Sequence, residues 1–446
     1  MPSSAAPRSR LSRLIIYGTL IEPHERTAVL LAFLCYFVLF ASYYILRPVR
    51  DTVATVFGVD GLPWLFTGTF IGTIVASPLY AWLASRLKLK RFLPTVLWFW
   101  LLNVVGFAAC FAVAPQSRPL AAIFYWWFSI ANLFMISIFW SLMVDLFSTT
   151  QAARLFALIA SGGSFGAIVG PVITRLAVHA IGLSGVLLIA AVGLLGVIVL
   201  VHLLMREKER LRAAGEEVQQ STFDHGLAGN PFEGFFQVLK SPYSRSQAGF
   251  ILLMTWANTV GYFLQTEVVA MAFSAVEARA VAIADISLVV NICTAVILFF
   301  GLGHFVRRFG VTATLIANPF IMVIAFLALA FSPTLLMIQA LQVVRQVTQY
   351  AIARPSREMC FTVVDQKDRY KTKNVIDVVV YRFGDLSSAW ILAGLRTAGA
   401  RVFGSCMAGV AFSVLWGLVA LQLGRRYERR RAQESASSPA PAQAVR

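Results

Sequence analysis

Two arginines and one aspartate lie at the end of the first long apolar stretch of the chain. This stretch begins near Thr27 and closes in YYILRPVRD, residues 43–51. A charged side chain held in the hydrocarbon of a membrane costs roughly 2.5–3.5 kcal/mol, so these residues need a specific environment. Two interpretations are open. Arg47 and Arg50 either reach past the helix end into lipid headgroups, or line a polar cavity and bind an anion.

A second group of ionisable residues lies inside a later apolar stretch, 374–396. Asp377, Tyr381 and Asp385 follow one another at intervals of four residues, which places them on one face of a helix. Arg382 lies beside this face, three residues before Asp385. Two acids and a base inside a membrane helix require water or partners. They form either a structural ion pair or a gate in which the arginine changes its partner.

Amide side chains form a stripe in the stretch 333–352. The stripe repeats every three or four residues and consists of Gln339, Gln342, Gln346 and Gln349, with Arg345 close to it. Such a stripe either joins helices through hydrogen bonds or forms the wall of a solvated cavity that faces an anion. Because an arginine can bind phosphate or carboxylate through two parallel hydrogen bonds, we regard Arg345, Gln342 and Gln346 as candidate substrate ligands.

Three glycines spaced by four residues lie in the run SGGSFGAIVGP, residues 161–171. The run is not a phosphate-binding loop, because it lacks both the GK[ST] ending and a preceding strand. Small residues at this spacing allow two membrane helices to approach closely. We therefore predict that Gly162, Gly166 and Gly170 serve helix packing.

The composition indicates a membrane protein. Of the 446 residues, 58% are hydrophobic and only 13% are charged, whereas soluble domains carry about 25% charged residues. The net charge of +17 does not indicate nucleic-acid binding, because most basic residues fall in loops and tails on one predicted side of the membrane. The five cysteines and five histidines show no disulfide or metal-ligand pattern, so we predict neither a metal nor a cofactor.

Twelve apolar stretches, each about as long as a membrane-spanning helix, divide the chain into two halves. We predict a basic lead at 1–27, a six-helix half at 28–205, a linker at 206–245, a second six-helix half at 246–423 and a disordered tail at 424–446. Short basic turns, ASRLKLKRF at 84–92 and HFVRRFG at 304–310, follow the second and eighth stretches. Turns at these two places are typical of major facilitator transporters, whose substrate site lies between the halves.

The loops between the stretches alternate in charge. Even-to-odd connections carry most of the arginines and lysines, which places both chain ends in the cytoplasm. The cluster of Arg47 and Arg50 is the exception, because this topology assigns it to the outer side. The exception favours a cavity for these arginines over an outer loop.

Three motifs together resemble the ATP/ADP antiporter family, the non-mitochondrial nucleotide translocases of the major facilitator superfamily. They are YILRPVRD at 44–51, RLFALIASGGSFG at 154–166 and NVIDVVVYRFGD at 374–385. The resemblance covers nearly all twelve stretches. It implies that Arg47, Arg50 and Asp51 line a positive cavity that contacts nucleotide phosphates, and that Arg382 holds the basic position of the eleventh helix. Arginine replaces the lysine that parasite and plastid members favour at several of these sites, so the resemblance supports anion transport more firmly than nucleotide transport.

We therefore expect an all-α transporter that exchanges a small anionic substrate of the ATP/ADP type by alternating access, rather than an enzyme. The alternative is a proton-coupled transporter or exporter of another organic anion or small molecule, with Asp51, Asp377 or Asp385 carrying the proton. In the exchange mechanism, Asp51, Asp377, Asp385 and Tyr381 form gates instead. We expect a monomer in a bacterial inner membrane, with lipid as its surroundings and no nucleic-acid partner.

Overall fold

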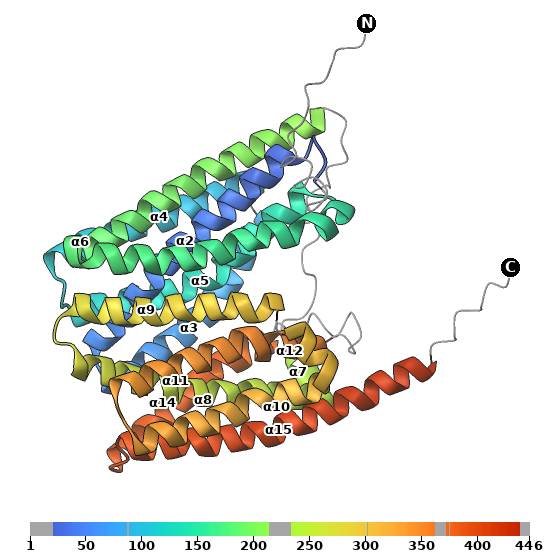
Figure 1. The fold of residues 1–446 in the computed structure, drawn as a ribbon. Coiled ribbons are helices and arrows are strands. Elements are labelled where there is room, and N and C mark those ends of the chain that lie inside the picture. Colours follow the sequence, from blue (N-terminus) through green and yellow to red (C-terminus); the bar gives the residue numbers. More distant parts are fainter. Residues whose placement is uncertain are drawn as a thin grey trace, which may run out of the picture. The chain divides into compact units, whose positions relative to one another are not determined.

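A computed structural model describes residues 21–86, 89–213, 233–300, 302–361, 372–373 and 375–437. All regular structure in these ranges is helical (Figure 1). The helices up to the linker are α2 (Arg26–Phe57), the short 3-10 helix η1 (Val59–Gly61), α3 (Leu62–Arg86), α4 (Leu89–Val113), α5 (Arg118–Leu146) and α6 (Thr149–Ala213). The prediction of an all-α polytopic membrane protein is confirmed.

The helices after the linker include two short π-helical segments. In chain order they are α7 (Glu233–Lys240), α8 (Pro242–Ala272), α9 (Val276–Phe300), α10 (Leu302–Phe331), α11 (Leu335–Thr348), the π-helix η3 (Gln349–Ala353), α12 (Arg354–Cys360), the π-helix η4 (Val375–Val380), α14 (Tyr381–Thr397) and α15 (Val402–Ser437). A π-helix bonds residue i to i+5, is rare, and occurs often at functional sites.

The predicted count of twelve spans agrees with these helices. Eight of them are long and apolar enough to cross a membrane within the part of the chain that the structure describes. One of the eight, α6, contains two spans, because Gly182 breaks it with a φ of 65° that residues with a Cβ rarely adopt. The remaining three spans are α8, α11 and α14, which carry many of the polar side chains discussed below.

The chain divides into two compact units whose boundary does not coincide with the linker alone. The first unit comprises 1–50 and 76–226, and the second comprises 51–75 and 227–446. The helices α2 and α3 therefore each contribute residues to both units. The segment 51–75 packs with the helices of the second half, although the sequence assigns it to the first.

Two predicted helix ends are wrong. The first stretch was expected to close within residues 43–51, but α2 continues to Phe57 with Pro48 inside it. Apolar residues resume directly after the charged cluster, so the cluster interrupts the hydrophobic pattern without ending the helix. The arginines 47 and 50 consequently lie well inside a helix, and an interpretation that places them beyond its end no longer holds.

The C-terminal tail was expected to be disordered from Gly424, yet α15 continues to Ser437. Residues 425–431 read RRYERRR, and arginine and glutamate are good helix formers. Gly424 does not cap the helix. A Cβ at this position would lie 2.5 Å from Oγ1 of Thr312, so the glycine permits close packing of α15 on α10. Residues 438–446 lie outside the described part of the chain.

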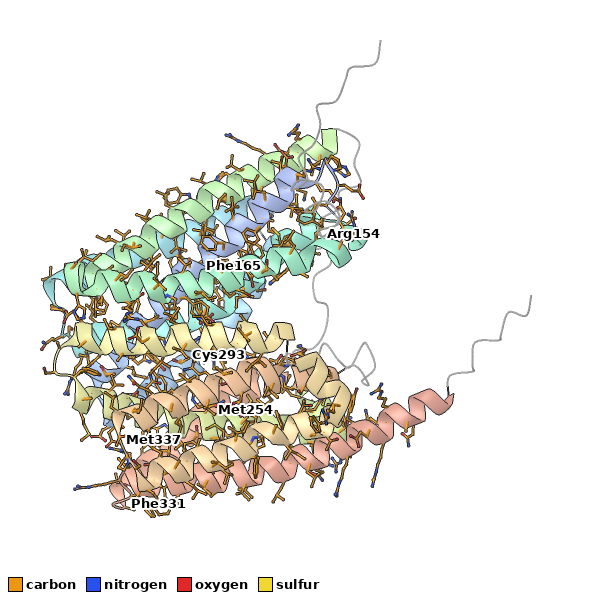
Figure 2. All side chains as sticks on the ribbon, viewed as in Figure 1. Arg154, Phe165, Met254, Cys293, Phe331 and Met337 are labelled. Atoms are coloured by element: carbon orange, nitrogen blue, oxygen red, sulfur yellow. The ribbon has the colours of Figure 1, made fainter. Side chains whose placement is uncertain are left out.

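Large apolar side chains cover much of the helix surfaces. Phe165 on α6 is 57% exposed and Phe331 at the end of α10 is 80% exposed (Figure 2). In a membrane protein such side chains face lipid, because lipid tails are as apolar as the side chains themselves. The chain is therefore a multi-pass membrane protein.

Candidate functional site

The guanidiniums of Arg47 and Arg50 contact aromatic rings within the first unit. Arg47 lies 5.6 Å from the centre of the Tyr44 ring. Arg50 lies 5.3 Å from the Tyr125 ring and 5.8 Å from the Phe128 ring, both on α5. Both arginines are half-buried. Aromatic faces stabilise a cation electrostatically, which explains how two positive charges are tolerated inside α2.

Asp51 begins the segment of α2 that belongs to the second unit. Its carboxylate accepts a hydrogen bond of 3.2 Å from the Tyr262 hydroxyl on α8, and the residue is 9% exposed. One turn later, Thr55 accepts a hydrogen bond of 3.3 Å from Arg279 on α9. These contacts hold the C-terminal part of α2 against α8 and α9.

The same segment continues into α3, where its contacts are made with α14. The indole Nε1 of Trp390 donates to Thr67 at 3.1 Å, and the Trp64 and Trp390 rings meet edge to face with centres 5.2 Å apart. Arg396 makes a bidentate ion pair with Glu267 on α8, with N–O distances of 2.7 and 3.2 Å. The two residues lie 129 positions apart, so their spacing in the sequence does not indicate this pair.

The predicted glutamine stripe forms a buried contact between α11 and α8. Gln342, which is fully buried, donates to the carbonyl of Gly261 at 2.5 Å. Its own oxygen accepts two hydrogen bonds from Arg345, at 2.9 and 2.7 Å. Arg345 also donates to Asn258 at 3.3 Å. Of the two interpretations of the stripe, this geometry is that of interhelical hydrogen bonding.

The other amides of the stripe differ in their exposure. Gln346 and Gln349 are buried, whereas Gln339 is half-buried. Thr348, which lies between the two buried amides, donates to Asn318 on α10 at 2.9 Å. The stripe thus faces protein at its centre and is partly exposed only at its first residue.

An ion-pair cluster joins α12 to the beginning of η4. Arg357 donates to Glu358 at 2.7 Å and lies 2.8 Å from a carboxylate oxygen of Asp377. Lys373 donates to the other oxygen of Glu358. Burial raises the pKa of Glu358, but hydrogen bonds from Lys373 and Arg357 outweigh burial and hold this pKa below its usual value. The partner of Asp377 is thus Arg357, which also belongs to the second half.

Arg382 and Asp385 form the ion pair that their spacing predicts, with an N–O distance of 3.3 Å. The guanidinium lies 6.0 Å from the centre of the Tyr381 ring. Both charged side chains are about 15% exposed, Arg382 at 15% and Asp385 at 14%. The predicted face of Asp377, Tyr381 and Asp385 thus carries two ion pairs, both of which join residues of the second half.

The glycine run 161–171 lies against the backbone of α2. A Cβ at Gly162 would lie 2.5 Å from the Phe33 carbonyl oxygen, and one at Gly170 would lie 2.7 Å from the Ala41 carbonyl oxygen. A Cβ at Gly166 would overlap the Phe37 carbonyl oxygen. All three glycines therefore allow α6 and α2 to approach more closely than any residue with a side chain would permit.

One group of possible metal ligands lies before α2 in the described ranges. Ligand atoms of Glu22, His24 and Glu25 lie within 4.8 Å of one another. Arg154 already contributes a positive charge here, at 2.7 Å from Glu25 and 3.2 Å from Glu22. An ion pair rather than a metal site explains this group.

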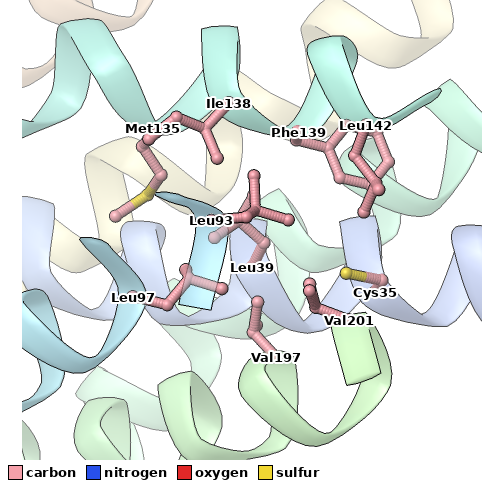
Figure 3. Close-up of a pocket in the computed structure, with 10 residues that line it drawn as sticks. All are labelled: Cys35, Leu39, Leu93, Leu97, Met135, Ile138, Phe139, Leu142, Val197 and Val201. Atoms are coloured by element: carbon pink, nitrogen blue, oxygen red, sulfur yellow. The ribbon is translucent and has the colours of Figure 1, made fainter. Parts of the chain in front are cut away.

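A small cavity in the first unit is lined by apolar side chains (Figure 3). It lies among residues of α2, α4, α5 and α6, including Cys35, Leu97, Met135 and Val197. Its volume is about 10 Å³, which is about the space of one water molecule. The cavity offers no charged or polar donor, so it does not suit an anionic substrate.

Comparison with known proteins gives a match over most of the chain. Residues 32–348 match the sequence profile of the Major Facilitator Superfamily. No curated protein matches the sequence significantly.

Several solved structures of transporters are similar in fold. A bacterial homologue of the human lysosomal transporter Spinster, inward-facing and unoccupied, has a TM-score of 0.55 at 15% identity, covering 94% of this chain and 100% of that one. A bacterial homologue of the iron transporter ferroportin, also inward-facing, has a TM-score of 0.64 at 10% identity, with 89% and 98% covered. The nucleoside transporter NupG has a TM-score of 0.57 at 12% identity, with 90% and 98% covered. At these identities the similarity concerns the fold alone.

Proposed function

The chain belongs to the Major Facilitator Superfamily, and from this premise we propose that it is a secondary transporter that exchanges an anionic substrate of the ATP/ADP type. Membership of this family agrees with a small-molecule transporter in a lipid environment and not with an enzyme. The superfamily named by the sequence resemblance is thereby confirmed. The family does not specify the substrate, and the exchange of ATP for ADP is our more specific proposal.

The observation that carries the proposal is the pair of half-buried guanidiniums inside α2. Arg47 and Arg50 lie ten and seven residues before the last residue of that helix, Phe57. Charges inside membrane helices are rare and generally mark a substrate or ion pathway. Arginine also matches the geometry of phosphate and carboxylate groups. In our proposal these two side chains bind the phosphates of the substrate.

In the second half, Arg382 is the proposed contact for the anion. Its ion pair with Asp385 is long, at 3.3 Å, so an arriving phosphate could compete with this carboxylate. Arg345 is held by Gln342 and is only 9% exposed. We assign Arg345, Gln342 and Gln346 the role of positioning α11 against α8. In this proposal the Arg345 guanidinium reaches the anion only when the two helices separate.

The proposed mechanism is alternating access with gates that the substrate opens. Asp385 and Asp377 hold arginines when no substrate is present, and Tyr262 holds Asp51. A polyanion that binds the arginines releases the carboxylates, and this differential affinity shifts the conformational equilibrium. Tyr381, next to Arg382, belongs to the same gate. We further propose a monomer in the bacterial inner membrane with both termini in the cytoplasm.

The experiment that tests the proposal measures substrate exchange in proteoliposomes preloaded with ADP and supplied with labelled ATP. We expect Arg47→Gln to reduce exchange at least about tenfold, since one charge-assisted contact contributes roughly 1.5–3 kcal/mol. Arg47→Lys keeps the charge but not the bidentate geometry, so it should retain partial activity. Arg118→Gln removes an exposed arginine at the start of α5 and serves as the control. Equal exchange by all variants would contradict the proposal.

The proton-coupled alternative is supported by the buried carboxylate of Asp51, which is 9% exposed. Asp51→Asn separates the two mechanisms, because the gate model and the proton model both assign a role to this carboxylate. A gate that has lost its carboxylate lets substrate leak without exchange, whereas a lost proton carrier preserves exchange and abolishes accumulation driven by a pH gradient. If ADP and ATP have no effect and other organic anions are transported, the nucleotide part fails while anion transport stands.

A further inference from the structure

The last helix, α15, is much longer than a membrane span. Its 36 residues extend over about 54 Å at 1.5 Å per residue, whereas the hydrocarbon core of a bilayer is about 30 Å thick. The apolar part ends near Leu423, and the part that follows contains five arginines in RRYERRR. Figure 2 shows nitrogen-tipped side chains projecting from this part of the helix.

Two of these arginines fasten the extension to α8. Arg426 donates to the Pro242 carbonyl and to the Ser246 hydroxyl, the latter at 2.6 Å. Arg430 lies 4.4 Å from the centre of the Tyr243 ring, and Tyr243 itself is only 2% exposed. The extension is therefore a fixed part of the second unit.

Glu428, an acidic residue of the extension, points toward α10. Glu428 accepts a hydrogen bond of 2.5 Å from the Thr312 hydroxyl. Its charge is thus directed to a neighbouring helix, in the same region where Gly424 packs on Thr312. The opposite side of α15 keeps its positive charge.

The outer side of α15 changes from apolar to basic along one line, which we call the outer stripe. It consists of Val414, Leu415, Leu418, Arg425 and Arg429, all of them exposed. Arg425 and Arg429 follow Leu418 by seven and eleven residues, so at about 100° per residue they lie within about 20° of it around the helix axis. They lie roughly 10 and 16 Å farther along that axis.

We propose that the outer stripe binds an anionic phospholipid, with Arg425 and Arg429 on its phosphate and Val414, Leu415 and Leu418 along an acyl chain. The two arginines follow directly after the apolar part of α15, which ends near Leu423, and headgroups begin where the apolar part of a membrane helix ends. Arginine pairs with phosphate oxygens through parallel hydrogen bonds. Basic clusters directly beyond a membrane helix attract anionic lipids.

A lipid fits this surface better than a soluble anion does. The charged end of the stripe is continuous with side chains that are 48%, 48% and 60% exposed, namely Val414, Leu415 and Leu418. A lipid uses both parts, whereas inorganic phosphate would use only the two arginines. The headgroup class is therefore an anionic phosphodiester such as phosphatidylglycerol.

The test uses the full chain in two kinds of nanodisc, one of phosphatidylcholine alone and one in which phosphatidylglycerol replaces about one fifth of it, since anionic lipid attracts basic residues beside the membrane. Native mass spectrometry counts retained lipid, and thermal unfolding reports stabilisation by bound ligand. We expect Arg425→Gln/Arg429→Gln to weaken retention of phosphatidylglycerol about 30-fold. The double variant Arg425→Lys/Arg429→Lys keeps both positive charges, so its retention of phosphatidylglycerol should fall less.

The control is Arg401→Gln, which removes an exposed arginine directly before the first residue of α15, far from the outer stripe's arginines, and should leave lipid retention unchanged. Equal retention by wild type and the double glutamine variant would overturn the proposal, as would an equal loss in Arg401→Gln. Stabilisation by inorganic phosphate that matches the lipid effect would also overturn it. If the double variant fails to fold, retention by wild type must fall steeply with salt, and salt-independent retention would count against the proposal.

Discussion

A carboxylate oxygen of Asp377 lies 2.8 Å from Nη1 of Arg357, and this pair connects the two stretches of the chain that contain π-helices. Arg357 follows η3 in α12, and Asp377 lies within η4. The side chains are 11% and 28% exposed. An ion pair at this depth is shielded from solvent, so it tightens the contact between the two stretches more than a surface pair would.

The π-helix η3 changes the side of the helix on which Arg357 lies. Arg345 and Arg357 are twelve residues apart, which in a regular α-helix would separate them by about 120° around the axis. The one extra residue of a π-turn shifts the register by about 100°. Arg357 is thereby turned to nearly the same side as Arg345, where its partner lies on the neighbouring stretch.

We predict that Arg357 and Asp377 stabilise the protein as a pair. Arg357→Gln should lower the free energy of unfolding by about 1–3 kcal/mol, because it leaves the partly buried Asp377 without this partner. Asp377→Asn should lower it by less, because Arg357 still pairs with Glu358. The double variant should lose at least about 0.5 kcal/mol less than the sum. Chemical unfolding in mixed micelles measures all four proteins of this cycle.

The matched control is the pair of Glu207 and Arg210, which is also an ion pair but has an arginine 75% exposed. Its coupling should not exceed about 0.5 kcal/mol. Equal coupling energies for the two pairs would show that burial has no influence on the Arg357–Asp377 interaction.

The lowered pKa of Glu358 predicts an acid-sensitive contribution to stability. Because hydrogen bonds from Lys373 and Arg357 place its pKa in the folded protein below the unfolded value of about 4.5, the contribution is complete above that pH. It disappears as the pH falls through the folded pKa. Unfolding midpoints measured from pH 7 to pH 3 should fall more for wild type than for Glu358→Gln. Parallel curves would contradict this prediction.

The spacing of residues predicted local features but not their partners. The intervals correctly placed Tyr381 and Asp385 in one helix, and the i,i+3 spacing identified the Arg382–Asp385 pair. Asp377 lies in the preceding π-helix, which its spacing did not indicate. The pair of Arg357 and Asp377 could not be predicted, because it depends on the π-turn and on the fold that brings two stretches together. Hydrophobicity alone also misjudged the end of α2, since Arg47 and Arg50 lie within a continuing helix.

The buried hydrogen bonds of Gln342 predict a loss of stability without a loss of charge. Gln342→Met removes the bond to the Gly261 carbonyl and both bonds from Arg345. The first bond joins α11 to α8 and the other two lie within α11. At roughly 0.6 kcal/mol for each, the variant should be destabilised by about 2 kcal/mol. Gln339→Met, at the half-buried start of the stripe, should change stability by less than about 0.5 kcal/mol. Similar losses in both would argue against the α8–α11 contact.

The contact of α6 with α2 gives the sharpest prediction, because it depends on single atoms. A Cβ at Gly166 would overlap the Phe37 carbonyl oxygen and lie 2.8 Å from the Ala41 nitrogen. Both are backbone atoms, which cannot move aside as a side chain can. Gly166→Ala should therefore force the helices apart and lower the free energy of unfolding by about 1–3 kcal/mol.

The control for this substitution is Gly106→Ala in α4, where no atom lies within 4 Å of the added Cβ. There the alanine should stabilise the helix by up to about 1 kcal/mol, because glycine is the poorer helix former. The two variants carry the same chemical change, and thermal unfolding should therefore shift in opposite directions. A shift of the same sign and size in both would show that helix propensity, and not the close approach of α6 to α2, determines the effect at Gly166.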